Sequence, residues 1–139
     1  MQQFLPQGGF VLAIRTDSET AELYILTREG KIANKQIWQA GRNLSKDLLK
    51  TISNLLKKAE INFNNLGAVV VYRGPGSFTG LRIGISVANA IAYSLDIPVV
   101  GTTGKRWITV DSKQINKTKN RQFIVPEYGA EPNITKPKK

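Results

Sequence analysis

The chain has 139 residues and a net charge of +10, and 41% of its residues are hydrophobic and 22% charged, which fits one globular domain. The sequence contains no Cys and no His, which excludes disulfides, thiolate and Ser-His-Asp nucleophiles, and most zinc sites. No apolar run approaches the ~18 residues of a membrane span and the first residues do not resemble a signal peptide, so we expect a cytoplasmic protein.

The first part of the chain predicts three strands. Residues 9–16 form an apolar run of strand length, and residues 21–27 alternate apolar and polar side chains, as half-buried strands do. A short connection around Gly30 suits a hairpin and leads into a weaker strand over residues 31–39. These segments predict an antiparallel meander.

The apolar period changes to three and four over residues 41–59, which predicts an amphipathic helix. A β-branched strand is expected over 66–72, a glycine-rich turn over 73–80, a second helix over about 79–95 and a fifth strand ending at 101. The order β-β-β-α-β-α-β predicts an α/β fold. It is the pattern of an actin-like or ribonuclease H-like lobe, with a mixed sheet of about five strands and two helices.

The glycine-rich turn R-G-P-G-S-F-T-G does not match the common nucleotide-binding motifs. Its glycines are one residue too far apart for a dinucleotide fingerprint, and it lacks the Lys of a phosphate-binding loop. Two interpretations stay open, which are a nonstandard phosphate site at a helix N-terminus and a purely structural turn. In the second, the glycines permit a tight backbone and Ser77 or Thr79 caps the helix.

The second helix carries small residues at four-residue spacing, namely Gly80, Gly84, Ala88 and Ala92. They form a ridge without large side chains, which allows another element to approach closely. Each glycine costs about 1 kcal/mol of helix propensity, so close packing must compensate. The ridge packs either against this chain's own sheet and first helix, or against a helix of another chain.

The positive charge is concentrated near the C-terminus. Residues 105–139 hold 9 Lys and Arg against 3 Asp and Glu, whereas residues 1–104 hold 11 against 7. Such a segment is either a solvated tail or a contact for a polyanion such as RNA. We therefore divide the chain into a folded lobe over 1–104 and a basic extension over 105–139, whose end we expect to be disordered.

The segment over residues 69–101 resembles the TsaB (YeaZ) family, above all in G-P-G-S-F-T-G-L-R-I-G at 74–84. Weaker matches are L-A-I-R-T at 12–16, G-R-N-L-S-K-D-L-L at 41–49 and P-E-Y at 126–128. Members of that family have two actin-like lobes and work in making N6-threonylcarbamoyladenosine in tRNA. The resemblance implies a noncatalytic subunit without a cofactor of its own, because ATP and metal are expected on its partner, the catalyst TsaD, which modifies adenosine 37.

The resemblance also implies that this chain pairs with TsaD through a bundle of its two helices, which supports the interface interpretation of the ridge. The expected interface residues are Leu48, Leu49, Ile52, Leu55, Leu56, Gly80, Leu81, Gly84, Ile85, Ala88 and Ala92. The signature loop is expected to comprise Arg73, Gly74, Pro75, Gly76, Ser77, Phe78, Thr79 and Arg82. A bulky residue at Gly84 or Ala88 should then abolish binding and leave the fold intact. A TsaE-type ATPase is expected to dock on the pair, and a homodimer is expected when the partner is absent.

Three departures from the family pattern stand out. Arg15 replaces the usual Asp at the end of the first strand, where related enzymes hold a metal, and a guanidinium cannot bind a cation. Leu44 replaces a common His, and the chain ends before a second lobe, so we expect a single-lobe form. The alternatives are a small phosphotransferase or nuclease and a stand-alone basic RNA-binding module. In the complex, the basic extension could also help to hold tRNA.

Overall fold

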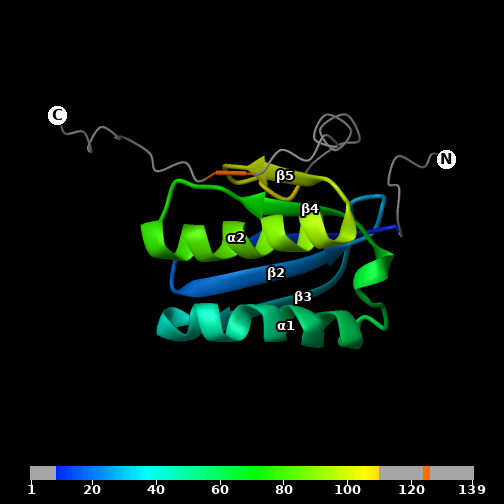
Figure 1. Cartoon of the computed structure of the whole chain (residues 1–139), viewed down its shortest axis with the longest axis horizontal. Helices are drawn as coiled ribbons and strands as arrows, with labels where there is room; N and C mark the ends of the chain where they lie inside the picture. The colour runs from blue at the N-terminus through cyan, green and yellow to red at the C-terminus, as the bar shows by residue number, and fades with distance from the viewer. Residues whose placement is uncertain (1–8, 110–123, 126–139) are drawn as a thin grey trace.

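Five strands and two α-helices follow one another in the order that the sequence predicts (Figure 1). The structure is a computed structural model, and it describes residues 9–109 and 124–125. The elements are β1 (Phe10–Arg15), β2 (Thr20–Leu26), β3 (Ile32–Gln39), α1 (Leu44–Lys58), β4 (Leu66–Tyr72), α2 (Phe78–Leu95) and β5 (Val99–Thr102). Two short 3-10 turns, Gly41–Asn43 and Phe63–Asn65, precede α1 and β4. The predicted α/β fold is confirmed.

The sheet has the strand order β3-β2-β1-β4-β5. Strand β2 pairs antiparallel with β1 and with β3, which is the predicted meander. Strand β4 pairs parallel with β1 and with β5. The parallel pairing places the carboxyl ends of β1 and β4 at the same edge of the sheet. The glycine-rich turn that follows β4 therefore begins beside the residues that follow β1.

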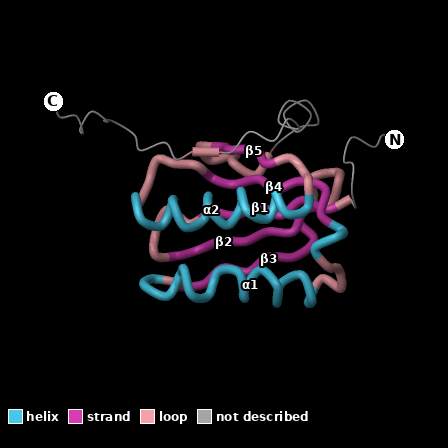
Figure 2. Tube along the Cα trace, in the orientation of Figure 1, coloured by secondary structure: helices cyan, strands magenta, loops and turns pink. Residues whose placement is uncertain are grey.

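Both helices lie on the same face of the sheet (Figure 2). Helix α1 packs over β2 and β3, and α2 packs over β1, β4 and β5. Each helix connects two strands, and right-handed crossovers in this strand order require both helices on one side. Helix α1 buries one stripe of leucine and isoleucine, as its period predicts, consisting of Leu44, Leu48, Ile52, Leu55 and Leu56.

An aromatic cluster covers the other face of the sheet. Successive residues of a strand point to opposite faces, so Tyr24 and Tyr72 face away from the helices. The buried Trp107 contacts both rings edge-on, with ring centroids 5.8 Å from Tyr24 and 6.2 Å from Tyr72. Trp107 and Ile124 belong to the predicted basic extension, yet both pack against the core of the lobe.

The rest of the predicted extension, residues 110–123 and 126–139, lies outside the described residues, so its disorder stays a prediction. Among the helices that the structure describes, none combines the length and the apolar character needed to cross a membrane.

Candidate functional site

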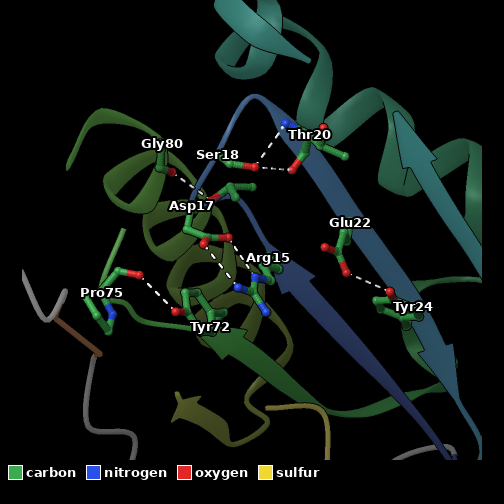
Figure 3. Close-up of polar contacts among 10 residues, drawn as sticks. Arg15, Asp17, Ser18, Thr20, Glu22, Tyr24, Tyr72, Pro75 and Gly80 are labelled. Atoms are coloured by element: carbon green, nitrogen blue, oxygen red, sulfur yellow. Dashed lines mark hydrogen bonds and ion pairs between the residues drawn. The ribbon is translucent and has the colours of Figure 1, made fainter. Parts of the chain in front are cut away.

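The signature loop packs on the end of β1. The hydroxyl of Tyr72 donates to the Pro75 carbonyl at 2.9 Å (Figure 3). The Ser77 amide donates to the Asp17 carbonyl at 2.8 Å. Gly74 has φ +122°, a backbone conformation that residues other than glycine rarely adopt. Ser77 caps α2 by accepting from the Gly80 amide at 3.5 Å, so the predicted cap is Ser77. The loop is thus tied to the residues that follow β1.

The remaining signature glycines are explained by the close approach of α2 to Thr16 and Asp17. A Cβ at Gly76 would collide with the Asp17 side chain. Cβ atoms at Gly80 and Gly84 would collide with the carbonyl and the hydroxyl oxygen of Thr16, respectively. The Thr16 hydroxyl is buried and donates to the Gly80 carbonyl at 2.7 Å. The spacing of the glycines is therefore explained by the close packing of α2 on the sheet of the same chain.

This arrangement corrects the prediction for the small-residue ridge. Ten of the eleven expected interface residues are buried inside the chain, and they are Leu48, Ile52, Leu55, Leu56, Gly80, Leu81, Gly84, Ile85, Ala88 and Ala92. They pack between the helices and the sheet, so in this fold they support the helix surface and do not form it. Leu49 is the exception among the eleven, with 54% of its surface exposed.

The exposed side of the helices carries an apolar groove that the ridge prediction missed. Its volume is about 280 Å³, and it is lined by Leu49, Phe63, Val87, Ala90, Ile91, Ser94 and Leu95. Leu49 comes from α1 and most of the other residues come from α2, so the groove runs between the two helices. Ser94 is its one polar lining residue.

A second hollow of about 450 Å³ shares Val87 with this groove and reaches the signature loop. Its lining residues are Ser45, Phe78, Thr79, Arg82, Ile83, Ser86 and Val87. Phe78 is 53% exposed, and the Arg82 guanidinium lies 5.1 Å from the centroid of its ring. We call the two hollows together the outer groove. Phe78, Thr79 and Arg82 of the predicted signature loop thus belong to the same surface as Leu49 of the predicted interface.

The sequence contains a periodic pattern that indicates the outer-groove residues absent from the predicted interface. Ile83, Val87, Ala90 and Ser94 recur at three- and four-residue steps, one flank away from the small-residue ridge. On a helix with apolar residues over more than half of its circumference, this period alone does not show which flank meets the sheet.

The end of β1 holds an ion pair in place of a single carboxylate. Arg15 Nε lies 2.7 Å from Asp17 Oδ1, and its guanidinium carbon lies 4.0 Å above the Tyr72 ring (Figure 3). The hydrogen bond to Asp17 raises the pKa of Arg15 above its usual value. Within residues 9–109 and 124–125, no three Asp, Glu, His or Cys side chains gather as metal ligands. The positive charge of Arg15 balances the negative charge of the Asp17 carboxylate in this ion pair.

Comparison with known proteins places these features in a family. A family model described as TsaD, tRNA N6-adenosine threonylcarbamoyltransferase, matches residues 32–121. The TsaB protein of tRNA threonylcarbamoyladenosine biosynthesis from Bacillus subtilis (strain 168) is 30% identical over 106 residues, which are 76% of this chain and 46% of the relative. A tRNA N6-adenosine threonylcarbamoyltransferase from Bacillus thuringiensis (strain Al Hakam) is 37% identical over 62 residues, which are 45% of this chain and 18% of the relative.

Solved structures agree with this similarity. YeaZ from Pseudomonas aeruginosa superposes with a TM-score of 0.63 and 30% sequence identity, over 68% of this chain and 44% of that chain. The chain therefore spans less than half the length of these relatives.

Proposed function

Because the chain belongs to the TsaB (YeaZ) family within the TsaD-type proteins, we propose that it is a noncatalytic subunit in tRNA threonylcarbamoyladenosine biosynthesis. In this proposal it binds a TsaD-type catalytic subunit, which supplies ATP and metal and modifies adenosine 37 of tRNA. The setting is cytoplasmic. The single observation that carries the proposal is the outer groove between α1 and α2.

The outer groove suits a helix of a partner protein. An amphipathic helix binds by laying its apolar face into a groove of this kind. Leu49 and Phe78 expose more than half of their surface at its margins, and exposed apolar patches mark interaction sites. A TsaD-type protein contains a segment similar to this chain, so the two proteins can present similar helical faces to each other. Such a pairing is the approximate counterpart of the isologous contact in a symmetric dimer.

The ion pair at the end of β1 supports the noncatalytic part of the proposal. Enzymes of the related folds are expected to place a metal-binding carboxylate at this position, and here the Arg15 guanidinium occupies it. A bound cation next to that guanidinium would experience direct charge repulsion. Docking of a TsaE-type ATPase on the pair and contact of residues 105–139 with tRNA extend the proposal, and they rest on the family resemblance and on charge.

The test is size-exclusion chromatography with light scattering, on the full chain alone and mixed with the TsaD-type protein of the same organism. We expect a one-to-one complex. Leu49→Arg should weaken it at least about 30-fold, the effect of losing an interface hot spot. Ile37→Arg is the matched control, because Ile37 is 47% exposed on β3, away from the groove.

Two outcomes would contradict the proposal at different levels. Unchanged affinity of the Leu49→Arg variant would remove the outer groove from the interface, whereas no complex with the unmodified chain would reject the partner itself. If this chain alone forms a dimer and the TsaD-type protein dissociates it, the dimer and the complex use the same surface.

The alternative of a stand-alone RNA-binding module rests on the net charge of +10. It predicts that the chain alone binds RNA with an affinity that falls steeply with salt concentration. Binding of RNA by the isolated chain, combined with indifference to the TsaD-type protein, would favour this alternative.

A further inference from the structure

One carboxamide on α2 binds the backbone of a residue 35 positions later. Asn89 Nδ2 donates to the Ile124 carbonyl at 2.9 Å, and Asn89 Oδ1 accepts from the Ile124 amide at 3.0 Å. The two hydrogen bonds to one residue reproduce the pattern of a hydrogen-bonded pair in an antiparallel sheet. That pattern needs the amide and the carbonyl of Ile124 on the same side, as in an extended backbone. The Asn89 carboxamide therefore binds Ile124 as the backbone of a neighbouring strand would.

Two further residues complete the contact. A Cβ at Gly101 of β5 would lie 2.9 Å from Ile124 Cγ2 and 2.6 Å from Arg73 Cδ, so the absence of a side chain there makes room for both. Arg73, which directly follows β4, donates from Nε to the Val125 carbonyl at 3.3 Å. The Ile124 side chain is half-buried and packs against the core.

We propose that Asn89, Arg73 and Gly101 form a binding site for an extended peptide backbone, and that residues 124–125 of this chain occupy it. The polar contacts reach backbone atoms, so they are independent of side-chain identity at Val125, which is exposed. Selectivity comes from Gly101, which accepts an aliphatic side chain at the position of Ile124. The site ties the chain to α2 directly before Pro126-Glu127-Tyr128.

The backbone site and the first hollow of the outer groove, lined by Leu49 and Val87, lie on different flanks of α2. Ser86 of the second hollow precedes Asn89 by three residues and lies on the same flank as Asn89. At 100° per residue, Asn89 is about 200° around the helix from Val87 of the groove. A peptide segment in the backbone site therefore leaves the first hollow, with Leu49, open to a partner. Loss of the backbone site should release residues 124–125 and leave the affinity for a TsaD-type protein unchanged, so the two proposals fail separately.

The test is NMR on the full chain, with hydrogen exchange at the Ile124 amide as the readout. We expect this amide to be protected, and Asn89→Leu, which keeps the volume and removes both hydrogen bonds, should accelerate its exchange about tenfold. Asn54→Leu is the matched control, because Asn54 is an exposed asparagine on α1, and it should leave the Ile124 exchange rate unchanged.

An unprotected Ile124 amide in the unmodified chain, or equal protection in the Asn89→Leu variant, would overturn the proposal. If Asn89→Leu does not fold, NMR of the unmodified chain still tests the proposal. The proposal requires nuclear Overhauser contacts between the Asn89 carboxamide protons and the backbone protons of Ile124, and their absence would reject it.

Discussion

The two flanks of helix α2 differ in the size of their residues and in what covers them. The inner flank carries Gly80 and Gly84, which lie against Thr16 with no room for a Cβ. The outer flank carries Val87 and Ala90, which line an open apolar groove. The two glycines mark the close approach of α2 to Thr16, whereas Val87 and Ala90 line a surface that another molecule can cover. A helix can therefore carry two apolar flanks with separate roles in folding and in binding.

The largest expected effect is a loss of stability from filling the inner flank. Gly84→Leu places a side chain where Thr16 already lies, and overpacking without a route for relaxation should lower the free energy of unfolding by about 3 kcal/mol or more. This corrects the expectation that a bulky residue at Gly84 would spare the fold. Urea denaturation followed by circular dichroism measures the difference.

The control for this substitution lies on the other flank of the same helix. Ala90 is exposed, so Ala90→Leu adds the same side chain without a clash, and stability should change by no more than about 0.5 kcal/mol. A Gly84→Leu variant with normal stability that no longer binds a TsaD-type protein would return the ridge to the interface and break the comparison.

A smaller effect is expected from the polar contact that holds the inner flank. Thr16→Val keeps the shape of the side chain and removes the hydrogen bond to the Gly80 carbonyl, which should cost about 1 kcal/mol of unfolding free energy. Thr16→Ser keeps the hydroxyl and serves as the control for that hydrogen bond. Partner affinity should stay constant in both variants. Equal stability of Thr16→Val and the unmodified chain would show that close packing alone holds α2.

The elements of the fold could be predicted because each leaves a local period in the sequence. The β-branched run at 66–72 coincides with β4, and the predicted helix over about 79–95 coincides with α2 to within one residue. Helix α1 begins three residues later than predicted, because Gly41–Asn43 forms a 3-10 turn first. The order of these segments then restricts the topology, since parallel strands require crossovers of one hand.

The candidate site could be predicted only in part, because its contacts join distant residues. The spacing of Gly80 and Gly84 predicts a close neighbour, but that neighbour is Thr16, 64 positions before Gly80. Nothing in the local pattern distinguishes a sheet of the same chain from a helix of another chain. The contact between Asn89 and Ile124 has no periodic signal at all, since it depends on where the chain returns to α2.

A pH-dependent effect is expected on the far face of the sheet, away from both flanks of α2. Burial, and then the hydrogen bond to Glu22, raise the pKa of Tyr24 to about 12. The unfolded chain loses this proton near pH ~10, so between about pH 10 and pH 12 unfolding releases a proton and the free energy of unfolding falls as pH rises. Below about pH 10 the contribution is constant.

Tyr24→Phe keeps the ring against Trp107 and removes the titrating hydroxyl. The stability difference between the unmodified chain and this variant should therefore shrink from pH 9 to pH 12 on a series of denaturation curves. A difference that stays constant over this range would show that Tyr24 titrates alike in both states. Because the other ionisable groups titrate in both chains, the comparison isolates this tyrosine. It therefore provides a measure of folding that substitutions in the outer groove should leave unchanged.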